Sequence, residues 1–387
     1  MNDGLPHAVV RALKSCLPVD QAQIALHEPW IAGNEWIYVK ECLDTGWVSS
    51  LGKFVDRYEA ELAAYTGAQS AVAVVNGTEA LHMCLLLIGV RAGDEVLVPA
   101  LTFVATANAV VYCGATPHFV DSDEQTLGVD AVKLADYLGE IAELRSDGAY
   151  NRASGRRIKA LAVMHTFGHP VDLDPIAETC LRYRITLVED AAESLGSFYK
   201  GRHTGNHGHV SALSFNGNKT VTTGGGGAIL TNDRELGLQA KHLTTTARVA
   251  HRWEFLHDAV GYNYRLPNIN AALGCAQLEQ LPRFLDRKRA LAERYRVAFA
   301  RVPGVHFFTE PPFARSNYWL NAILLDQTSA SLRDEVLRVT NESGLMTRPV
   351  WTLMHRLPMF QSCPRMPLDV AEDLAKRLIN IPSSAFL

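Results

Sequence analysis

The sequence lacks the features that mark a secreted, membrane or nucleic-acid-binding protein. Its seven cysteines are scattered through 387 residues without a Cys-x-x-Cys pair, which favours reduced thiols over disulfides or a zinc site. No stretch reaches about 18 apolar residues, and the first residues carry Asp3 and no apolar core of signal-peptide length. Lys and Arg total 37 against 41 Asp and Glu, and neither sign forms a long run. We therefore expect a cytoplasmic protein without a membrane or nucleic-acid partner.

Two nucleotide-binding fingerprints and a metal cluster are also missing. Residues 217–220 read GNKT, but the P-loop pattern GxxxxGK[ST] is absent, and the glycine run follows the lysine instead of preceding it. The GxGxxG fingerprint does not follow the first clear strand. The histidines His203, His207 and His209 alternate with glycines in an expected loop, so we predict no metal site.

The pattern of apolar residues predicts an α/β fold with two domains. Short apolar runs alternate with helical patterns after about Ala71, which is typical of a mainly parallel sheet sandwiched by helices. A polar stretch at 139–157 is expected to be a surface excursion. The pattern then changes to one long helix, about 268–302, followed by a strand, helix, strand sequence. We predict a large domain with its N-terminal segment over 1–267, and a connecting helix with a smaller C-terminal α/β domain over 268–387.

One lysine stands between a strand end and a run of four glycines. Lys219 lies in SFNGNKTVTTGGGG, and apolar runs lead into and out of this stretch. The middle is therefore expected to be a tight loop between two buried strands. Glycine tolerates close backbone approach, so the loop can fold tightly around whatever the lysine contacts. For an arbitrary chain the simpler interpretation is a surface lysine on a glycine-rich loop.

Four strand ends supply what a lysine-bound cofactor would need. Gly77 and Thr78 follow the first strand, where free N–H groups at a helix start favour a phosphate, although Thr at such a place is usually only a cap. Asp190 and Ser214 end two further strands, and the acid could equally cap the next helix. Phe103 follows a fourth strand and is either core or a stacking residue. A phosphate cradle, an acid, an aromatic face and a lysine together predict a site for pyridoxal 5'-phosphate.

The chemistry of that cofactor explains each residue type. A lysine amine binds the cofactor aldehyde, and once an amine substrate displaces it, the free lysine becomes a base beside the reacting carbon. A carboxylate such as Asp190 keeps the pyridine nitrogen protonated, which lets the ring hold electrons. Phe103 could supply a flat apolar face against the ring.

Five ordered motifs connect these residues to a known family. NGTEAL, PALTFVATAN, EDAAES, SFNGNKTVTTGGGGA and GYNYRLPNINAALG occur in the chain in that order. With these motifs the chain resembles the DegT/StrS-like nucleotide-sugar aminotransferases of pyridoxal phosphate fold type I, from about His27 to Ser384. MHTFGHP, NYWLNAILL and TRPVWTLMHRLPMF look most similar to the LegC-type branch, which aminates UDP-4-keto-6-deoxy-N-acetylhexosamines.

The resemblance implies a role for each matched residue. Lys219 resembles the cofactor-binding lysine and Asp190 the partner of the pyridine nitrogen, while Glu193 replaces a residue, often Gln, near the ring hydroxyl. Gly77, Thr78 and Ser214 match phosphate contacts, and Phe103 matches the stacking residue. Asn263 matches an asparagine that reaches the phosphate of the neighbouring subunit, which implies a homodimer with shared active sites.

Three further residues are implied as substrate contacts. Many relatives have His-Pro-Ser before the lysine where this chain has Asn216, Gly217 and Asn218, although the LegC-type branch shares FNGNK. Asn216 is expected either to contact substrate or to hold the loop. Arg348 and His355 lie in a stretch that approaches the sugar nucleotide in relatives, and a packed loop is the alternative.

The implied activity is a transamination. The retained lysine separates the chain from related sugar 3-dehydratases, in which His replaces it. We expect L-glutamate as donor and UDP-2-acetamido-2,6-dideoxy-4-keto-hexose as acceptor. The alternatives are GDP-4-keto-6-deoxymannose, as in perosamine formation, or a non-enzymatic pyridoxal phosphate-binding regulator on the same fold.

Overall fold

The fold was analysed in a computed structural model that describes residues 4–18 and 21–387. Residues 1–3 and 19–20 lie outside the described residues. Two expectations fall partly on them: the one about the first residues of the chain, and the start of the domain at residue 1. No described helix is long and apolar enough to cross a membrane.

The elements follow the predicted alternation through the first two thirds of the chain. The helices are α1 (Leu5–Cys16), α2 (Glu35–Thr45), α3 (Lys53–Thr66), α4 (Gly77–Leu87), α5 (Val104–Tyr112), α6 (Ala131–Ile141), α7 (Leu173–Tyr183), α8 (Arg234–Thr244), α9 (Asn268–Phe299), α10 (Arg333–Glu342) and α11 (Asp369–Arg377). The strands of the large sheet are β1 (Ser70–Val74), β2 (Glu95–Pro99), β3 (Thr116–Val120), β4 (Ala142–Arg145), β5 (Gly148–Asn151), β6 (Arg157–Met164), β7 (Thr186–Asp190), β10 (Val210–Ser214) and β11 (Gly227–Thr231).

The large sheet places the carboxyl ends of its parallel strands on one edge. Its main order is β1-β11-β10-β7-β6-β2-β3, and β11 runs antiparallel to both of its neighbours. The pairs β10–β7, β7–β6, β6–β2 and β2–β3 are parallel. Because β1 and β10 are both antiparallel to β11, they run in the same direction as each other. The ends of β1, β2, β7 and β10 therefore face the same side, as the sequence predicts.

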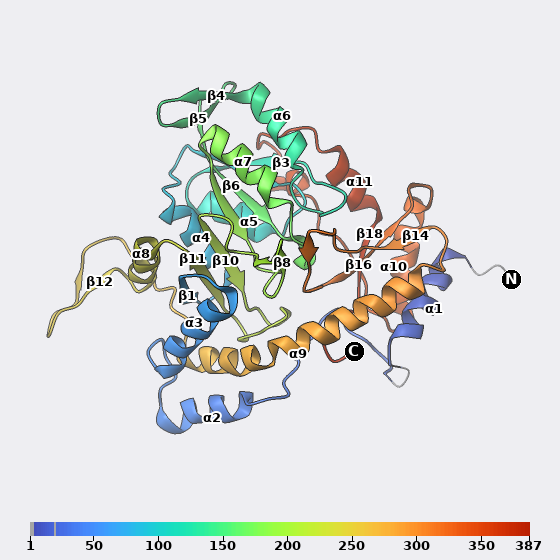
Figure 1. The fold of residues 1–387 in the computed structure, drawn as a ribbon, viewed down its shortest axis with the longest axis horizontal. Coiled ribbons are helices and arrows are strands. Elements are labelled where there is room, and N and C mark those ends of the chain that lie inside the picture. The colour runs from blue at the N-terminus through green and yellow to red at the C-terminus, as the bar shows by residue number, and fades with distance from the viewer. Residues whose placement is uncertain (1–3, 19–20) are drawn as a thin grey trace.

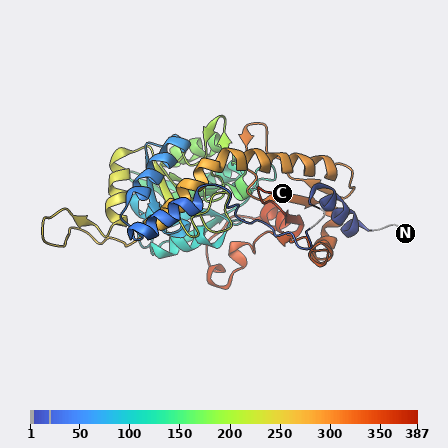
Figure 2. The same ribbon diagram turned by 90° about the horizontal axis from the view of Figure 1, so that it is seen from below.

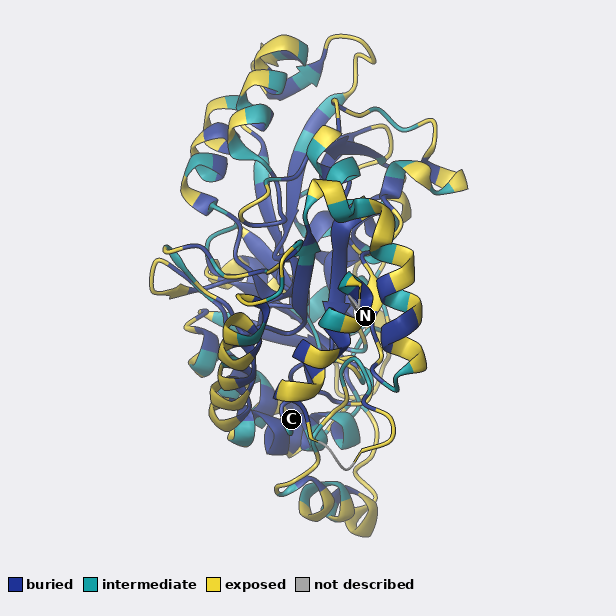
Figure 3. Cartoon of the chain, turned by 90° about the vertical axis from the view of Figure 1, so that its right-hand side faces the viewer, coloured by how far each residue is buried: buried dark blue, intermediate teal, exposed yellow. Residues whose placement is uncertain are grey.

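Helices cover both faces of this sheet (Figure 1). Along β1, Val72 and Val74 belong to the core cluster that includes α4, α5 and α7, whereas Ala71 and Ala73 belong to the cluster that includes α3 and α9. The two-residue period of a strand thus sends alternate side chains into two separate cores. Figure 3 shows the strands as a buried interior between exposed helix faces.

The polar excursion at 139–157 is more ordered than expected. β4 and β5 form an antiparallel hairpin, and β5 pairs with β6, so the stretch extends the large sheet. Glu95 on β2 anchors it by accepting hydrogen bonds from the Asn151 amide at 2.9 Å and the Ser154 hydroxyl at 2.5 Å. Charged residues on an exposed two-stranded edge hide its strand character from a periodicity analysis.

A second sheet lies at the far end of α9, a helix of 32 residues (Figure 1). It consists of β14 (Val305–Phe307), β16 (Asn321–Leu325), β18 (Leu378–Ile381) and β17 (Arg348–Pro349), all antiparallel in that order. The third core cluster joins this sheet to α10, to the end of α9 and to α1. The N-terminal helix thus packs with elements from the C-terminal third of the chain.

Smaller strands form two further sheets. β8 (Phe198–Tyr199) pairs with β9 (Arg202–His203) and with β15 (Ala314–Arg315), and the short strands β12 (Arg248–Val249) and β13 (Leu256–His257) pair with each other. The β12–β13 hairpin projects from the body beyond α8 (Figure 2).

Candidate active site

A cavity of about 280 Å³ opens at the carboxyl edge of the large sheet. Eight of the residues singled out from the sequence line it: Gly77, Thr78, Phe103, Asp190, Glu193, Ser214, Asn216 and Lys219. The lining also includes Asn76, Met164, Trp319 and Trp351. The strand ends therefore converge as the parallel sheet requires.

The start of α4 forms one wall of the cavity. Asn76 caps the helix, because its side-chain oxygen accepts a hydrogen bond from the Glu79 N–H at 2.9 Å. The interpretation of Thr78 as a cap is therefore wrong, since Thr78 is the second residue of the helix. A Cβ atom at Gly77 would lie 2.8 Å from the Ser214 Cβ and 3.1 Å from its Oγ, so only glycine allows this approach. Helix N–H groups and a serine hydroxyl thus meet at one point, a suitable cradle for a phosphate.

Asp190 lies at the end of β7 on the floor of the cavity. Its side chain is buried and accepts hydrogen bonds from the Thr106 hydroxyl at 2.6 Å and the Ala192 N–H at 3.2 Å. Burial raises the pKa of Asp190, while these two donors and the charge of Lys219 act in the opposite direction. The hydrogen bond from the Ala192 N–H is a local cap of the turn after β7. The hydrogen bond from Thr106 on α5 orients the Asp190 carboxylate from a different element.

Lys219 lies between a carboxylate and an indole ring. Its Nζ donates to the Glu193 Oε1 at 3.1 Å and stands 3.7 Å from the centre of the Trp319 ring. The expectation of a tight loop between two strands is confirmed, since residues 215–226 connect β10 and β11. A surface position is excluded because the Lys219 side chain is only 13% exposed.

Glu193 has an unusual environment for an acid. Its second oxygen, Oε2, accepts a hydrogen bond from the Phe167 N–H at 2.8 Å, and the residue is 3% exposed. Burial raises the pKa of Glu193 to about 7, against the lowering effects of Lys219 and the Phe167 N–H. The carboxyl can therefore exchange a proton near neutral pH.

Aromatic rings form the mouth of the cavity. Phe103 is 49% exposed, and its ring meets the Trp351 ring edge-on at 6.1 Å between centroids. Trp351 in turn packs against Phe167 at 5.0 Å. Phe103 is thus held at the cavity mouth instead of in the core, so its position is open to a flat ligand ring.

These residues fit pyridoxal 5'-phosphate. The glycine–serine approach at the start of α4 would accept the phosphate, and Phe103 the face of the ring. The Asp190 carboxylate is buried and accepts hydrogen bonds from two neutral donors, so it suits a protonated ring nitrogen. Lys219 reaches the same cavity from the loop that connects β10 and β11.

Three of the predicted site residues lie outside this cavity. Asn263 is exposed and forms an isolated bridge with Thr245 beyond α8. Arg348 is exposed and donates to the Asn341 side chain at 3.2 Å, and His355 makes a 2.7 Å contact with Glu372. Within one described chain they have local partners only, so their roles stay predictions.

The site also contains residues that sequence reasoning did not single out. Trp319 and Trp351 line the cavity from the C-terminal third, and Thr106 holds Asp190 from α5. Trp319 lies in the motif NYWLNAILL and Trp351 in TRPVWTLMHRLP. Both motifs belong to the family resemblance, and a large aromatic residue beside polar residues in such a motif could have indicated a site residue.

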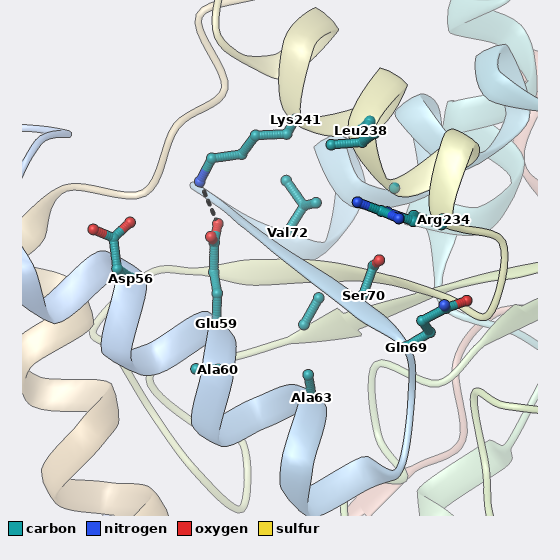
Figure 4. A pocket seen from close by; sticks show the side chains of 12 residues that line it. Asp56, Glu59, Ala60, Ala63, Gln69, Ser70, Val72, Arg234, Leu238 and Lys241 are labelled. Carbon is teal, nitrogen blue, oxygen red and sulfur yellow. Dashed lines mark hydrogen bonds and ion pairs between the residues drawn. The ribbon is translucent and has the colours of Figure 1, made fainter.

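A larger hollow, of about 620 Å³, lies elsewhere along β1, between α3 and α8 (Figure 4). In it the Lys241 Nζ donates to the Glu59 carboxylate at 2.6 Å, so two of its charges neutralise each other. None of the lysine, acid and phosphate-cradle residues described above lines it. The chemistry therefore belongs to the smaller cavity.

Fold and site together define a pyridoxal phosphate-dependent aminotransferase of the α/β class. The model of the DegT/DnrJ/EryC1/StrS aminotransferase family matches residues 30–387, and the chain belongs to that family. It is a pyridoxal phosphate-dependent enzyme that acts on nucleotide sugars, and the alternative of a non-enzymatic regulator is set aside.

Relatives and solved structures agree with this assignment. The chain is 39% identical over 361 residues to a GDP-perosamine synthase of Escherichia coli O157:H7, covering 93% of each chain. It is 37% identical over 371 residues to a GDP-perosamine synthase of Caulobacter vibrioides, covering 95% of each. The crystal structure of the aminotransferase TlmJ from Streptoalloteichus hindustanus superposes with a TM-score of 0.85 at 32% identity, covering 94% of each chain.

Proposed function

We propose that the protein transfers the amino group of L-glutamate to C4 of GDP-4-keto-6-deoxymannose and so forms GDP-perosamine. The observation that carries this proposal is the near full-length identity of 39% and 37% to two proteins named GDP-perosamine synthase. These relatives favour the GDP-linked alternative over the UDP-linked N-acetylhexosamine that the motifs led us to expect. The LegC-type resemblance therefore supports the family and not the particular sugar.

When bound, pyridoxal 5'-phosphate supplies the aldehyde that takes up the amino group and an electron-accepting ring. Lys219 is the residue that would hold the cofactor covalently in the resting enzyme and, once released, would move a proton at the reacting carbon. Asp190 holds the ring nitrogen protonated, for which Thr106 keeps its carboxylate in place at 2.6 Å.

The remaining cavity residues bind and orient. Gly77, Thr78 and Ser214 hold the phosphate at the start of α4, and Phe103 covers one face of the ring. Glu193 would lie beside the ring hydroxyl and, with a pKa of about 7, keeps a proton available next to Lys219. Asn216 is exposed at the cavity edge, where a sugar could reach its amide.

We further propose that the enzyme is a homodimer with shared active sites. Asn263 is exposed and outside the cavity of its own chain, which suits a residue that serves the neighbouring site. Large apolar side chains on the projecting hairpin and on α2 support an interface, since Trp253 and Phe255 are each 74% exposed and Trp36 is 80% exposed. A twofold axis would repeat the Asn263 contact in both sites.

The proposal extends to the organisation and place of the enzyme. We divide the chain into an N-terminal segment with the large cofactor-binding domain over 1–267, and a connecting helix with a smaller domain over 268–387, which the separate four-stranded sheet supports. A cytoplasmic location is proposed because glutamate and a nucleotide sugar are the substrates. Arg348 and His355 remain predicted substrate contacts.

The experiment is a substrate panel. The pure protein is incubated with L-glutamate and with GDP- and UDP-linked 4-keto-6-deoxy sugars in turn, and products are identified by mass spectrometry and NMR. We expect a 4-amino sugar from the GDP-linked mannose derivative, and none with Lys219→Ala as the control. Turnover of UDP-linked sugars alone would contradict the substrate and leave the aminotransferase class intact.

A further inference from the structure

We propose that Trp319 is a platform for the ammonium form of Lys219 during turnover, and that buried Lys288 is the residue that positions this tryptophan. The proposal rests on the proposed role of Lys219 as the cofactor-binding and proton-moving residue. It adds two residues from the C-terminal part of the chain that the cofactor contacts do not include.

The indole ring holds the lysine in two ways. The Lys219 Nζ lies 3.7 Å from the ring centre, which is within the range of a cation–π contact. The indole N–H donates to the Asn218 carbonyl at 2.7 Å, so the same ring also fixes the main chain directly before Lys219. Trp319 is 4% exposed, and its ring face is therefore shielded from water, where such a contact is stronger.

The main chain of Trp319 is fixed on both sides. Its N–H donates to the Asn317 Oδ1 at 2.8 Å, while the Asn317 amide donates to the Glu193 and Leu195 carbonyls, each at 2.9 Å. Tyr318 adopts the left-handed region with φ of 48°, a conformation that costs energy for a side chain of this size. The strained backbone of Tyr318 lies next to Trp319, whose main-chain and indole N–H groups are both hydrogen-bonded. This combination indicates that the direction of the indole ring has a function.

Lys288 holds the Trp319 carbonyl from the opposite side. Its Nζ donates to that oxygen at 3.2 Å and to the Ser383 carbonyl at 2.5 Å, and it lies in hydrogen-bond contact with the His27 Nε2 at 2.9 Å. Lys288 is 0% exposed, and no carboxylate is among its partners in the described part of the chain. In its ammonium form Lys288 has three N–H donors, which matches these three partners.

Burying a lysine without an acid partner costs free energy, so Lys288 is expected to have a specific role. Burial lowers the pKa of Lys288 and also that of His27. An apolar residue at this place on α9 would avoid that cost. An apolar side chain could not connect the N-terminal segment, the C-terminal tail and Trp319 through hydrogen bonds to one atom.

The platform suits a lysine that gains and loses a proton. Each time the free Lys219 amine takes a proton from carbon it becomes an ammonium, and it returns to the amine on delivering that proton to the next carbon. A ring face attracts the ammonium but cannot accept its proton, unlike the carboxylate of Glu193. Trp319 therefore keeps the charged lysine within reach without removing the proton that it must deliver.

The test measures the reactivity of Lys219 in the cofactor-free protein. Trace acylation with a small anhydride at neutral pH is followed by peptide mass spectrometry, because only the uncharged amine reacts. We expect Trp319→Leu to raise the acylation rate of Lys219 on the order of fivefold, and Trp319→Phe, which keeps a ring face, to stay closer to the wild type. Trp351→Leu is the matched control, since it opens the same cavity without removing the ring under the lysine.

Two outcomes of this comparison overturn the proposal. One is an unchanged acylation rate in Trp319→Leu. The other is an equal increase in Trp351→Leu, which would mean that access of the reagent, not the ring face, sets the rate. Far-ultraviolet circular dichroism of every variant checks that it is folded.

Lys288→Met tests the positioning residue. We expect a faster acylation of Lys219 and a changed near-ultraviolet dichroism of the indole. Arg287→Met is the control. Arg287 donates to the Ala385 and Phe386 carbonyls, so its replacement loosens the C-terminal tail without removing a contact of Trp319. Equal effects of the two variants would refute a specific role for Lys288, and if Lys288→Met does not fold, the Trp319 variants decide.

Failure of this inference is distinguishable from failure of the proposed function. Borohydride fixation of the cofactor reports directly which lysine carries it. If the cofactor is fixed to Lys219 while acylation is insensitive to Trp319, only the platform is wrong. If it is fixed to a different lysine, the proposed role of Lys219 is wrong whatever the acylation rates.

Discussion

Replacing Glu193 by glutamine should remove a specific part of the pH dependence of stability. The Glu193 carboxyl accepts from the Phe167 N–H at 2.8 Å and from the Lys219 ammonium at 3.1 Å, and its pKa is raised by burial to about 7 from an ordinary value of 4.5. A glutamine amide can still accept from the Phe167 N–H, so Glu193→Gln keeps the shape of the site, while it removes the titration together with the oxygen that accepts from Lys219.

The sign and size follow from proton linkage. Between pH values of 4.5 and about 7 the native protein binds the proton that the unfolded chain has lost, so stability falls as pH rises through this range. From about pH 5 to about pH 8 this single group should cost ~2.5 kcal/mol of unfolding free energy. Glu193→Gln should therefore gain stability relative to the wild type by about that amount over the same interval.

The assay is urea unfolding of the cofactor-free protein at both pH values. The difference in unfolding free energy between Glu193→Gln and the wild type is compared at the two pH values. Taking this difference cancels the contributions of titrating groups that the two proteins share. Glu254→Gln, at an exposed position in the β12–β13 hairpin, is the control and should show no such gain. A stability difference for Glu193→Gln that stays constant with pH would refute the buried, proton-binding carboxyl.

Further predictions concern the cofactor and the assembly. Gly77→Ala should weaken cofactor affinity by about tenfold or more, because the added methyl enters the phosphate cradle, whereas Gly225→Ala, which meets only ordinary contacts, should not; fluorescence titration distinguishes them. Asp190→Asn should bind the cofactor yet slow proton abstraction by about 100-fold or more in stopped-flow measurements, and near-normal turnover would mean that the acid is only a cap. Mixing inactive Lys219→Ala and Asn263→Ala subunits should restore part of the activity, since one site of a mixed dimer is intact; mixtures that stay inactive despite proven subunit exchange would contradict shared sites.

The sequence was sufficient for the parallel strands of the large sheet and for one side of the site. Apolar runs such as AVAVV report burial on both faces of a strand, and parallel strands must end on a common edge. Gly77, Asp190, Ser214 and Lys219 could thus be brought together without knowing any contact.

The other side of the cavity could not be predicted in this way. Trp319 lies 100 residues after Lys219 in the chain, and its ring reaches the lysine through packing between the large sheet and the C-terminal elements. The periodicity of apolar residues predicts that a tryptophan is buried, but it does not predict which residue the tryptophan contacts. Lys288 is harder still, because a lysine in a long helix normally predicts an exposed face.

Two local features also escaped the sequence. The Thr78 hydroxyl suggested a cap, but the capping atom belongs to Asn76, since the residue that turns the backbone is decided by φ and ψ and not by residue type alone. The β4–β5 hairpin carries mixed charges on its open edge, so its composition resembles a loop although its backbone is paired. The proposed role of Asn263 involves a second copy of the chain, so it is tested in the assembled enzyme.

The identity of the lysine that carries the cofactor tests the account most directly. The protein is reconstituted with pyridoxal 5'-phosphate, reduced with borohydride, digested, and its peptides are mapped by mass spectrometry. The structure, with Lys219 in the cavity beside Glu193 and Trp319, predicts one modified peptide, which contains Lys219. Modification of a different lysine, or of none after the visible absorbance of the bound cofactor has developed, would contradict the account.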